Sequence, residues 1–537
     1  MSSNPFSAVA ARRWAAVLLT CFAAVSSGHA QTPAVSSFAP NYSTNNWLPP
    51  EAGFRKVILD EDATIAGEKR DTIVDPMELA VAADGRVFFV ERSGVVKMWK
   101  PANKTTSTIA KLAVFTGNED GMLGITLDPK FSENNWVYLN FGSPESFNDD
   151  KGNKMGLIRV SRFTLEGDTL NLASETKIID IPEQRITCCH VGGSLSFDAQ
   201  GSLYVSVGDN TNPFDSDGFS PSDDRPGHEP WDAQRSAGSG NSLTGKILRI
   251  KPKAQGGYDI PDGNLFKRGT AGTRPEIYVM GNRNPFRISL DRKTGYLYWG
   301  EVGPDAGSPS QKRGPAGFDE VNQARTAGFF GWPYFVADNK PYIPINFRAR
   351  QVWRDQVADY EKAKKEFKEG MPVPVKPADW PGADFSGTPH DAAHPVNNSP
   401  NNTGIKDLPA AQPAFIYYPP GQSTRFPVVG SGGRTAMAGP VYYFDPELKS
   451  ATKLPAAFDH TLFIYEWSRN WIIAVKLDAN DHILGMQRFM PGTEFKRPMD
   501  MELGPDGCLY LIEYGKEWGG NLDTKIVRIE YTGKNGE

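Results

Sequence analysis

The sequence predicts an all-β protein of the propeller class, and three observations support this prediction: a repeated hairpin, abundant turn residues, and helical periodicity in a single segment. The chain of 537 residues contains 53 glycines and 42 prolines. Such a composition is typical of many short strands joined by turns and long loops. Hydrophobic residues make up 39% of the chain, which suits a globular protein, and propellers commonly exceed the usual domain size.

The repeated hairpin consists of an alternating apolar strand, a tight turn of the Asp-Gly type, and a second strand rich in Tyr, Phe or Val. A single hairpin is marginally stable and cannot bury its apolar face. Five or six of them in one chain favour radial repetition, in which sheet edges stay short. A β-sandwich is the alternative, although it would not ordinarily repeat the same phrase so often. The copies are residues 77–92, 124–142, 192–210, 286–303 and 499–515, with a more divergent copy at 462–489.

The first 30 residues have the pattern of a secretory signal peptide. Arg12 and Arg13 precede an apolar stretch over residues 14–25, and small residues follow up to Ala30. This stretch is too short to span a bilayer, and cleavage is expected after Ala30. The mature protein is therefore expected to be secreted, most simply into a bacterial periplasm.

The rest of the chain is expected to contain one domain. Residues 31–50 are predicted to be a flexible segment, and residues 51–537 the propeller. Residues 348–370 alternate charges at helical spacing, which predicts an exposed helix. We interpret residues 340–413 as a partly helical insertion between late blades. No segment after the leader is long and apolar enough for a membrane span.

Charge and cysteine content limit the class of partner and the redox state. The formal net charge is −5, and removal of the leader with its two arginines lowers it to −7. A mildly acidic chain does not favour nucleic acid as a partner. Without Cys21 of the leader, Cys188, Cys189 and Cys508 remain, which allows one disulfide and one lone thiol in an oxidising compartment. Cys508 lies in the strand-like CLYLIEY and is expected to be a small buried residue.

The stretch ITCCHVGGS places His190 in front of two glycines at the start of the third repeat. Glycines allow the backbone to approach a ligand closely. An imidazole titrates near neutral pH, so His190 is a candidate general base. The alternative is a histidine that only satisfies backbone groups of its loop. The string CCH has the spacing of neither a zinc knuckle nor a haem attachment site.

Other candidate site residues also lie next to the repeated strands. Arg283 offers a planar fork for carboxylates, and Asn284 adds a donor and an acceptor. Gly303 and Pro304 present backbone carbonyls, which calcium accepts as ligands. Turn chemistry and surface ion pairs are the alternative explanation. Together, however, arginines from several repeats beside one histidine suit a flat polyanion at the channel mouth. The remaining candidates are Asp319, Glu320, Arg469 and Arg497.

From about residue 75 to its end, the chain resembles the glucose/sorbosone dehydrogenase family. Members of this family are six-bladed β-propellers that use pyrroloquinoline quinone (PQQ) and calcium. The order and spacing of the shared motifs make chance similarity improbable. These motifs are DGMLGITLDPKF (120–131), HVGGSLSFDAQGSLYVSVGDN (190–210), GKILRI (245–250), GNRNPF (281–286), EVGP (301–304), FGWPY (330–334) and the PDG-x-LY turn at 505–510.

The resemblance implies a role for each matching residue. His190 falls at the catalytic base, which takes the proton of the sugar C1 hydroxyl as hydride passes to the quinone. Arg283 and Asn284 match a pair that contacts PQQ, and Arg497 matches a later arginine of the cofactor site. The carbonyls of Gly303 and Pro304 match the ligands of the calcium that clamps the cofactor. Asp319 and Glu320 resemble the region of a second, structural calcium.

The sequence departs from the family pattern at four positions. Ser468 stands where a PQQ-binding lysine is expected, although Arg469 follows and could supply the charge. Met499 replaces a second late arginine. Cys189 replaces an acid next to the histidine, and Glu119 replaces a glutamine on the substrate side. These changes suggest a substrate other than glucose and leave PQQ binding less secure than the fold.

A bond between Cys188 and Cys189 would close an eight-membered ring. Neighbouring Cα atoms lie about 3.8 Å apart across a trans peptide, which is below the usual disulfide range. We hypothesise a vicinal disulfide that stiffens the loop carrying His190 and presents a flat apolar surface to the substrate or quinone. A redox role and a pair of buried thiols are the alternatives.

These observations predict a PQQ- and calcium-dependent dehydrogenase that oxidises a sugar at C1. The sequence contains no C-x-x-C-H haem motif, so electrons are expected to leave to an external cytochrome or quinone. A calcium-dependent propeller hydrolase of the lactonase type is one alternative, but it would need several converging carboxylates. A non-catalytic carbohydrate-binding propeller is the other.

Overall fold

The computed structural model describes residues 46–378 and 388–533. The described residues all belong to one compact unit. The predicted signal peptide, residues 1–30, and the first part of the predicted flexible segment, residues 31–45, lie outside the described residues.

Within the described residues, six sheets form the blades of a β-propeller, as the sequence predicts. In each blade the strands follow one another outward from the central channel. The first three blades contain β4 (Pro76–Val81), β5 (Val87–Glu91), β6 (Val95–Lys100) and β7 (Thr105–Lys111); β8 (Met122–Leu127), β9 (Trp136–Asn148), β10 (Lys154–Glu166) and β11 (Thr169–Gln184); and β12 (Gly192–Phe197), β13 (Leu203–Val207), β14 (Lys246–Pro252) and β16 (Ile277–Met280), extended by β15 (Tyr258–Asp259) and β20 (Gly328–Phe329). The last three contain β17 (Pro285–Leu290), β18 (Leu297–Glu301), β19 (Asp319–Ala324) and β23 (Ile416–Tyr418); β24 (Ala436–Tyr442), β25 (Thr461–Glu466), β26 (Trp471–Leu477) and β27 (Ile483–Phe489); and β28 (Pro498–Leu503), β29 (Leu509–Glu513), β30 (Lys525–Tyr531) and β1 (Phe54–Glu61).

Several short elements lie outside the blade pattern. They are η1 (Glu51–Gly53), β2 (Thr64–Ile65), β3 (Glu68–Lys69), α2 (Phe131–Asn134), η2 (Glu229–Trp231), β21 (Phe335–Val336), β22 (Lys340–Pro341), η3 (Pro427–Val429) and η4 (Ala456–Phe458).

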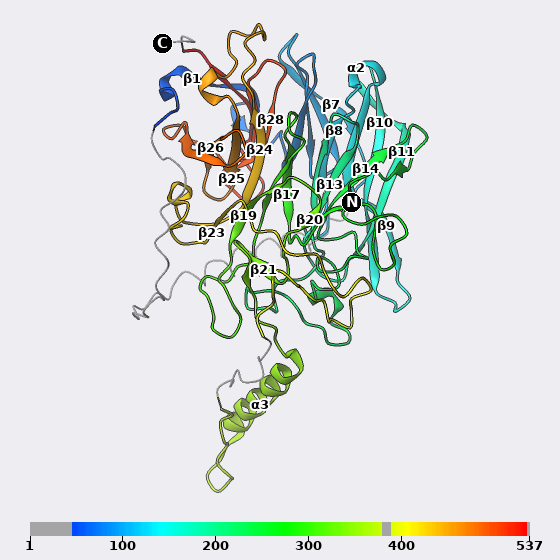
Figure 1. Ribbon diagram of the computed structural model, residues 1–537, viewed down its shortest axis with the longest axis vertical. Helices are drawn as coiled ribbons and strands as arrows, with labels where there is room; N and C mark the ends of the chain where they lie inside the picture. The colour runs from blue at the N-terminus through cyan, green and yellow to red at the C-terminus, as the bar shows by residue number, and fades with distance from the viewer. Residues whose placement is uncertain (1–45, 379–387, 534–537) are drawn as a thin grey trace. The chain divides into compact units, whose positions relative to one another are not determined.

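The innermost strands contact one another in a closed ring, in the order β4, β8, β12, β17, β24, β28 and back to β4. The last blade takes its outer strand from the other end of the chain, because β1 pairs antiparallel with β30. Figure 1 shows the blue β1 beside the red C-terminal strands. Since both ends of the described chain enter one sheet, the pairing of β1 with β30 holds the ring closed.

The repeated turn explains why the predicted hairpins form. In the first blade, Gly85 has φ +83° and its N–H donates to the carbonyl of Ala82. In the third, Oδ1 of Asp198 accepts from the N–H groups of Gln200 and Ser202, at 3.0 and 2.7 Å. Glycine supplies the left-handed conformation and aspartate bonds the backbone two residues on. The Asp-Gly signal in the sequence therefore fixes where each hairpin turns.

Five of the six predicted copies coincide with the two innermost strands of a blade. The divergent copy, residues 462–489, instead covers the second to fourth strands of the fifth blade, β25 to β27. The innermost strand of that blade is β24, which the sequence AMAGPVY supplies. Relative to the other five copies, this one therefore starts one strand too late in its blade. The innermost strand β24 was not recognised because it is fully buried and lacks the alternating pattern of the repeat.

The predicted insertion lies inside the fourth blade and not between two blades. It connects β19 to β23, the third and fourth strands of the same sheet. Its helix α3 spans Phe347–Glu366, close to the predicted 348–370. Asn346 caps this helix by accepting from the N–H of Ala349 at 3.0 Å, as its residue type favours.

The innermost strands are joined across the central channel by buried polar side chains. Arg287 is fully buried, and its guanidinium donates to the carbonyls of Met77 and Met499. Asp500 lies 3.6 Å from Arg287 and accepts from the N–H of Leu79 at 2.8 Å. Burial raises the pKa of Asp500, whereas the guanidinium of Arg287 opposes that rise. A buried charge of this kind is tolerated because it is paired and hydrogen-bonded.

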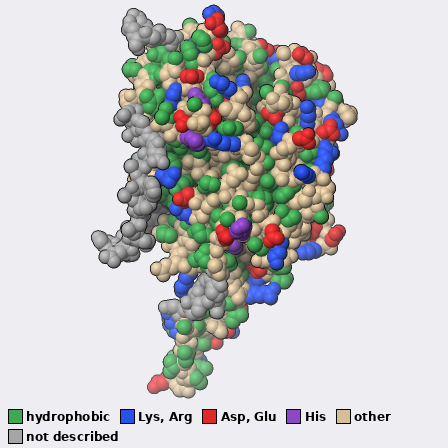
Figure 2. Space-filling model, viewed as in Figure 1, with side chains coloured by type: hydrophobic (Ala, Val, Ile, Leu, Met, Phe, Trp, Pro, Cys, Tyr) green, Lys and Arg blue, Asp and Glu red, His purple; other side chains and the backbone are tan. Residues whose placement is uncertain are grey.

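Among the described residues, no helix combines the length and apolar character that crossing a bilayer requires. On the face drawn in Figure 2, acidic and basic side chains are interspersed and not gathered by sign.

Candidate functional site

The two ends of the central channel differ in their residues. A cavity of about 650 Å³ is lined by the closing residues of all six innermost strands, such as Val81, Leu127 and Leu290. All six strands therefore run in the same direction. None of the sequence-predicted site residues lines this cavity.

The opposite end of the channel is formed by the loops that lead into the innermost strands. His190 precedes β12, Arg283 and Asn284 precede β17, and Arg497 precedes β28. Because these strands start at the same end, the structure brings four predicted residues from three blades to one end of the propeller.

His190 forms a buried pair with Asp209, which follows β13. The imidazole Nδ1 lies 2.9 Å from Oδ1 of Asp209, and His190 is 5% exposed. The indole Nε1 of Trp332 donates to Oδ2 of Asp209 at 2.9 Å, and the N–H of Thr211 donates to Oδ1 at 3.1 Å. An ionised carboxylate can only accept, so Asp209 selects the tautomer that carries its proton on Nδ1. The Nε2 atom of His190 is left as a base.

Glycine is required where the loop of His190 crosses the end of β13. A Cβ atom on Gly208 would lie 2.4 Å from the carbonyl carbon of His190. The N–H of Asn210 donates to the carbonyl of His190 at 3.1 Å. The sequence VGDN at the end of β13 therefore both supports the histidine loop and supplies its carboxylate partner.

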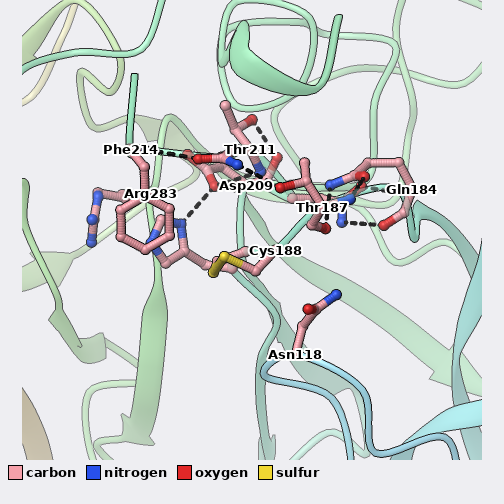
Figure 3. Close-up of a disulfide and its surroundings, with 12 residues drawn as sticks. Asn118, Gln184, Thr187, Cys188, Asp209, Thr211, Phe214 and Arg283 are labelled. Carbon is pink, nitrogen blue, oxygen red and sulfur yellow. Dashed lines mark hydrogen bonds and ion pairs between the residues drawn. A yellow bond between two sulfur atoms is a disulfide. The ribbon is translucent and has the colours of Figure 1, made fainter. Parts of the chain in front are cut away.

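Cys188 and Cys189 form the hypothesised vicinal disulfide, with Cα atoms 3.4 Å apart. The side chain of Gln184 ties down the preceding residues, because its Oε1 accepts from the N–H groups of Ile186 and Thr187 and its Nε2 donates to the carbonyl of Thr187. Figure 3 shows the disulfide between the Asp209 turn and Asn118 in this view, with Arg283 and Phe214 to one side. The lone thiol of Cys508 is buried elsewhere, where burial raises its pKa to about 12.

Arg283 and Asn284 are held by their backbone, and their side chains reach toward neighbouring loops. Both N–H groups donate to Oε1 of Glu301, at 2.5 and 2.6 Å. Oδ1 of Asn284 accepts from the N–H of Gly192 at 3.1 Å, which joins the fourth blade to the histidine loop. Nη1 of Arg283 donates to the carbonyl of Val302 at 2.9 Å. Its Nε is buried and has no hydrogen-bond partner within the described chain.

Arg497 lies against a pair of tryptophans that also contact each other. Its guanidinium is 4.1 Å from the ring centroid of Trp467 and 5.0 Å from that of Trp518. The N–H of Arg497 donates to Oδ1 of Asn470 at 3.0 Å. Nη1 is buried without a hydrogen-bond partner among residues 46–378 and 388–533. The two rings fix the orientation of the guanidinium by cation–π contact.

Arg469 contrasts with Arg283 and Arg497, because all three of its guanidinium nitrogens donate to backbone carbonyls. Nε donates to Gly433 at 2.6 Å, and the guanidinium also stacks 4.7 Å from the ring centroid of Tyr418. These contacts hold together the loop that precedes β24. The other acceptors are the carbonyls of Pro419, Val429, Gly430 and Gly432.

The segment expected to bind calcium is in contact with Arg434. Nη2 of Arg434 donates to the carbonyl of Pro304 at 2.7 Å, and Nη1 lies 3.2 Å from Oδ1 of Asp319. Asp319 is fully buried and also accepts from the N–H groups of Gly303 and Ala436, both at 3.0 Å. Burial raises the pKa of Asp319, and the guanidinium of Arg434 opposes that rise.

Glu320 lies on the opposite face of β19 from Asp319, since neighbouring strand residues alternate. Its Oε1 accepts from the N–H of Ala337 and its Oε2 from Nδ2 of Asn322. Glu320 faces Glu301 across the β18–β19 pair. Burial raises the pKa of Glu320 to about 7. The carboxylates of Asp319 and Glu320 therefore do not converge on one point.

In the described part of the chain, His, Cys, Asp and Glu side chains do not form a group of three or more that could hold a metal ion.

The departures from the family pattern have distinct surroundings. The hydroxyl of Ser468 is 2.8 Å from that of Thr435. Met499 is buried, and its carbonyl accepts from Nε of Arg287. Glu119 is exposed.

Three residues of this end of the propeller were missed by the sequence analysis: Asp209, Trp332 and Arg434. Asp209 and Trp332 lie within quoted motifs, VGDN and FGWPY, and a buried acid directly after a repeated strand is a signal that could have been used. Arg434 stands in GGRTAMAGP, directly before the unrecognised strand β24. Its neighbours in space come from a different blade, so the sequence carries no signal for its contacts.

Comparison with known proteins places the chain in a family. The family model of glucose/sorbosone dehydrogenases matches residues 73–372, more than half of the chain. Quinoprotein glucose dehydrogenase B of Acinetobacter calcoaceticus is 22% identical over 450 residues, covering 81% of this chain and 82% of that protein. Aldose sugar dehydrogenase YliI of Escherichia coli is 25% identical over 268 residues, covering 49% and 60%.

A solved structure shows the same fold. The PQQ-bound form of an aldose sugar dehydrogenase from Streptomyces coelicolor superposes with a TM-score of 0.51 at 17% identity, covering 90% of this chain and 99% of that one. The family match agrees with the six blades and with the motifs that they carry. The chain belongs to the glucose/sorbosone dehydrogenase family.

Proposed function

We propose that this protein is a secreted, PQQ-dependent oxidoreductase that oxidises an aldose at C1 and passes the electrons to an external acceptor. The observation that carries the proposal is the buried His190–Asp209 pair at the same channel end as arginines with unused guanidinium N–H groups. The names of the relatives from Acinetobacter and E. coli support a sugar as substrate.

The arginines at this end suit an anionic quinone. Nε of Arg283 and Nη1 of Arg497 are buried donors without a hydrogen-bond partner in the described chain. A buried donor without a partner costs about 1–3 kcal/mol, and a carboxylate would remove that cost. PQQ is a flat tricarboxylate, so its charge and its shape fit two guanidinium groups, one of them stacked on tryptophans. Arg469, with its nitrogens on carbonyls, would support the loop before β24.

Each residue of the proposed site has a defined task. Nε2 of His190 would take the proton of the sugar C1 hydroxyl, and Asp209 would stabilise the imidazolium that forms. The vicinal disulfide would hold the histidine loop and offer an apolar surface. The backbone of Asn284, fixed by Glu301, would keep the arginine loop in place. PQQ, when bound, would supply the hydride acceptor.

The calcium expected from the family resemblance fits less well. The carbonyl of Pro304 accepts from Arg434, and Asp319 accepts from two N–H groups beside the same guanidinium. Asp319 and Glu320 lie on opposite faces of their strand, so they do not form the expected second site together. No step of the proposed reaction is assigned to a metal.

The proposal is tested by reconstitution. The purified protein is mixed with PQQ, and quinone absorption and dye reduction are followed with a panel of aldoses. We expect a stoichiometric absorption change and reduction of the dye by at least one sugar. We expect His190→Ala to bind PQQ nearly as the wild type does and to lose roughly 10²–10⁴-fold in turnover.

Two outcomes would contradict the proposal. Absence of any PQQ binding would exclude the quinone and favour a carbohydrate-binding propeller. Wild-type turnover in His190→Ala would exclude the role given to the histidine. As a control for the substitution, His482→Ala changes an exposed histidine outside the site and should keep full turnover.

A further inference from the structure

Arg434 lies at the start of the fifth blade, and its side chain connects two segments of the fourth blade. Its side chain is 7% exposed, and its guanidinium bonds the carbonyl of Pro304 and lies beside the carboxylate of Asp319. Asp319 in turn bonds the N–H of Gly303, next to Pro304. The guanidinium therefore closes a compact, charge-balanced group of protein atoms around residues 303–304.

A divalent cation on the same carbonyl would conflict with these contacts. The carbonyl of Pro304 would have to give up its hydrogen bond with Arg434. A guanidinium is protonated at all pH values of interest, so it would also repel a cation bound at hydrogen-bond distance. Each oxygen of Asp319 already accepts from a backbone N–H, Oδ1 from Gly303 and Oδ2 from Ala436.

The guanidinium also retains a donor for a ligand. Nη1 of Arg434 is buried and makes no hydrogen bond with the described residues, although it lies near Asp319. Arg283 flanks the same segment, because its Nη1 donates to the carbonyl of Val302, two residues before Pro304. Two arginines from different blades thus bond alternate carbonyls of one loop and leave an N–H group unused.

We propose that Arg434 takes the place that the family resemblance assigns to the cofactor's calcium. This protein would then bind an anionic quinone without a divalent metal. The cofactor part of this inference rests on the function proposed above. The guanidinium supplies a fixed positive charge where the metal would supply it. It also supplies the link to the Pro304 carbonyl, as a hydrogen-bond donor and not as a Lewis acid.

The metal part of the inference is tested on the protein without cofactor. Thermal unfolding of the wild type is measured in EGTA and in excess calcium, and the two midpoints should coincide. In Arg434→Ala the Pro304 carbonyl and Asp319 are left without their cation, and both are oxygen ligands that calcium accepts. The midpoint of this variant should fall in EGTA and recover when calcium is added.

The cofactor part is tested by titrating PQQ into the wild type in EGTA and in calcium, with binding followed by quinone absorption. The wild-type dissociation constant should be the same in both. Arg434→Ala should bind PQQ more weakly in EGTA by about tenfold or more, the value of a charge-assisted hydrogen bond. Arg434→Lys keeps the positive charge and should lose less. Arg268→Ala, which removes an exposed arginine, should behave as the wild type.

The outcomes separate this inference from the proposed function. Calcium-dependent PQQ binding or a calcium-dependent melting point in the wild type would overturn the inference and leave the dehydrogenase proposal intact. If PQQ binds in neither buffer, the proposed function fails together with the cofactor part. The melting experiment then still decides whether Arg434 has replaced a metal.

Discussion

At the scale of single residues, the site is organised by a carboxylate that the histidine reaches only in the folded chain. Asp209 accepts from the imidazole, an indole and a backbone N–H. Each contact comes from a donor, so the carboxylate is held in one orientation. This arrangement decides which nitrogen of His190 carries the proton.

The tautomer argument predicts the effect of Asp209→Asn. With its oxygen toward Trp332, the amide would keep the indole hydrogen bond, lose the one from the N–H of Thr211, and turn its N–H₂ group toward Nδ1. The proton of the imidazole would move to Nε2, and the base would be lost. We expect turnover to fall roughly 10²–10⁴-fold with PQQ binding unchanged. Steady-state dye reduction and absorption titration measure the two quantities.

Asp62→Asn is the matched control for this change. Asp62 is also buried, at 1% exposure, and accepts from the N–H groups of Thr72, Ile73 and Thr524 away from the histidine. The turnover of the folded Asp62→Asn variant should stay at the wild-type value. Equal losses in both variants would show that Asp209 acts only through stability.

At the scale of elements, the innermost strands depart from regular pairing, five of them at their starting ends and β24 between Ala438 and Val441. Each of these six strands shifts its register against its neighbour; in β12 the shift lies between Gly192 and Leu195. A bulge re-aims the side chains beside it. The third and fourth blades can therefore present loop residues toward the channel end while the strands beyond remain regular. Farther out in the fourth blade, β19 starts at this same end and buries Glu320 opposite Glu301.

Glu320 predicts a pH dependence of stability. Its folded pKa of about 7 lies above the ordinary value of 4.5, so the folded state binds more protons between these two values. As the pH rises from 4.5 to about 7, the free energy of unfolding should fall by up to about 3 kcal/mol for this one group. Above that pH it should level off. Glu320→Gln is neutral throughout and should remove this contribution, whereas that of Glu502, whose pKa burial raises to about 7, should remain.

The substitution fits the local hydrogen bonds. Oδ1 of Asn322 is buried without a partner in the described chain, so rotation of this amide lets it accept from the introduced glutamine amide as it would from the protonated acid. Urea unfolding at several pH values measures the effect. Glu133→Gln, at an exposed position, should leave the profile as it is. A wild-type slope that persists in Glu320→Gln would contradict the assignment.

At the scale of the whole molecule, ring closure depends on β1. Phe54 at its start packs against Phe489 and Tyr531, with ring centroids 5.1 and 5.0 Å apart. These rings come from the last two blades, so a strand near one end of the described chain seals blades near the other end. Contacts between such distant parts of a sequence form slowly, because chain entropy opposes them.

Phe54→Ala should weaken this closure. Removal of a half-buried aromatic ring is expected to lower the free energy of unfolding by about 2 kcal/mol. Ile58→Ala, in the same strand but 44% exposed, should change it by less than about 0.5 kcal/mol. Urea denaturation measures both. Similar effects of the two changes would indicate that the aromatic packing does not hold β1 in place.

The blades could be predicted from local sequence alone, because alternation and Asp-Gly turns act over a few residues and need no distant partner. Five hairpins were located in this way, the helix of the insertion was located from charges at helical spacing, and the disulfide was a hypothesis from two adjacent cysteines. The offset of the 462–489 copy and the misplaced insertion have one cause: a buried strand and a three-residue strand carry too little alternation to be recognised.

Which groups meet at the site depends on tertiary structure. Arg469 and Arg434 stand equally close to strand starts in the sequence, yet Arg469 bonds the loop that precedes β24 and Arg434 bonds Pro304 of the preceding blade. Asp209 is brought to His190 by the hairpin of β12 and β13, and Trp332 by β20, which joins the sheet of the same blade. The partners of a long polar side chain depend on the backbone that the fold places around it, and local sequence does not contain that information.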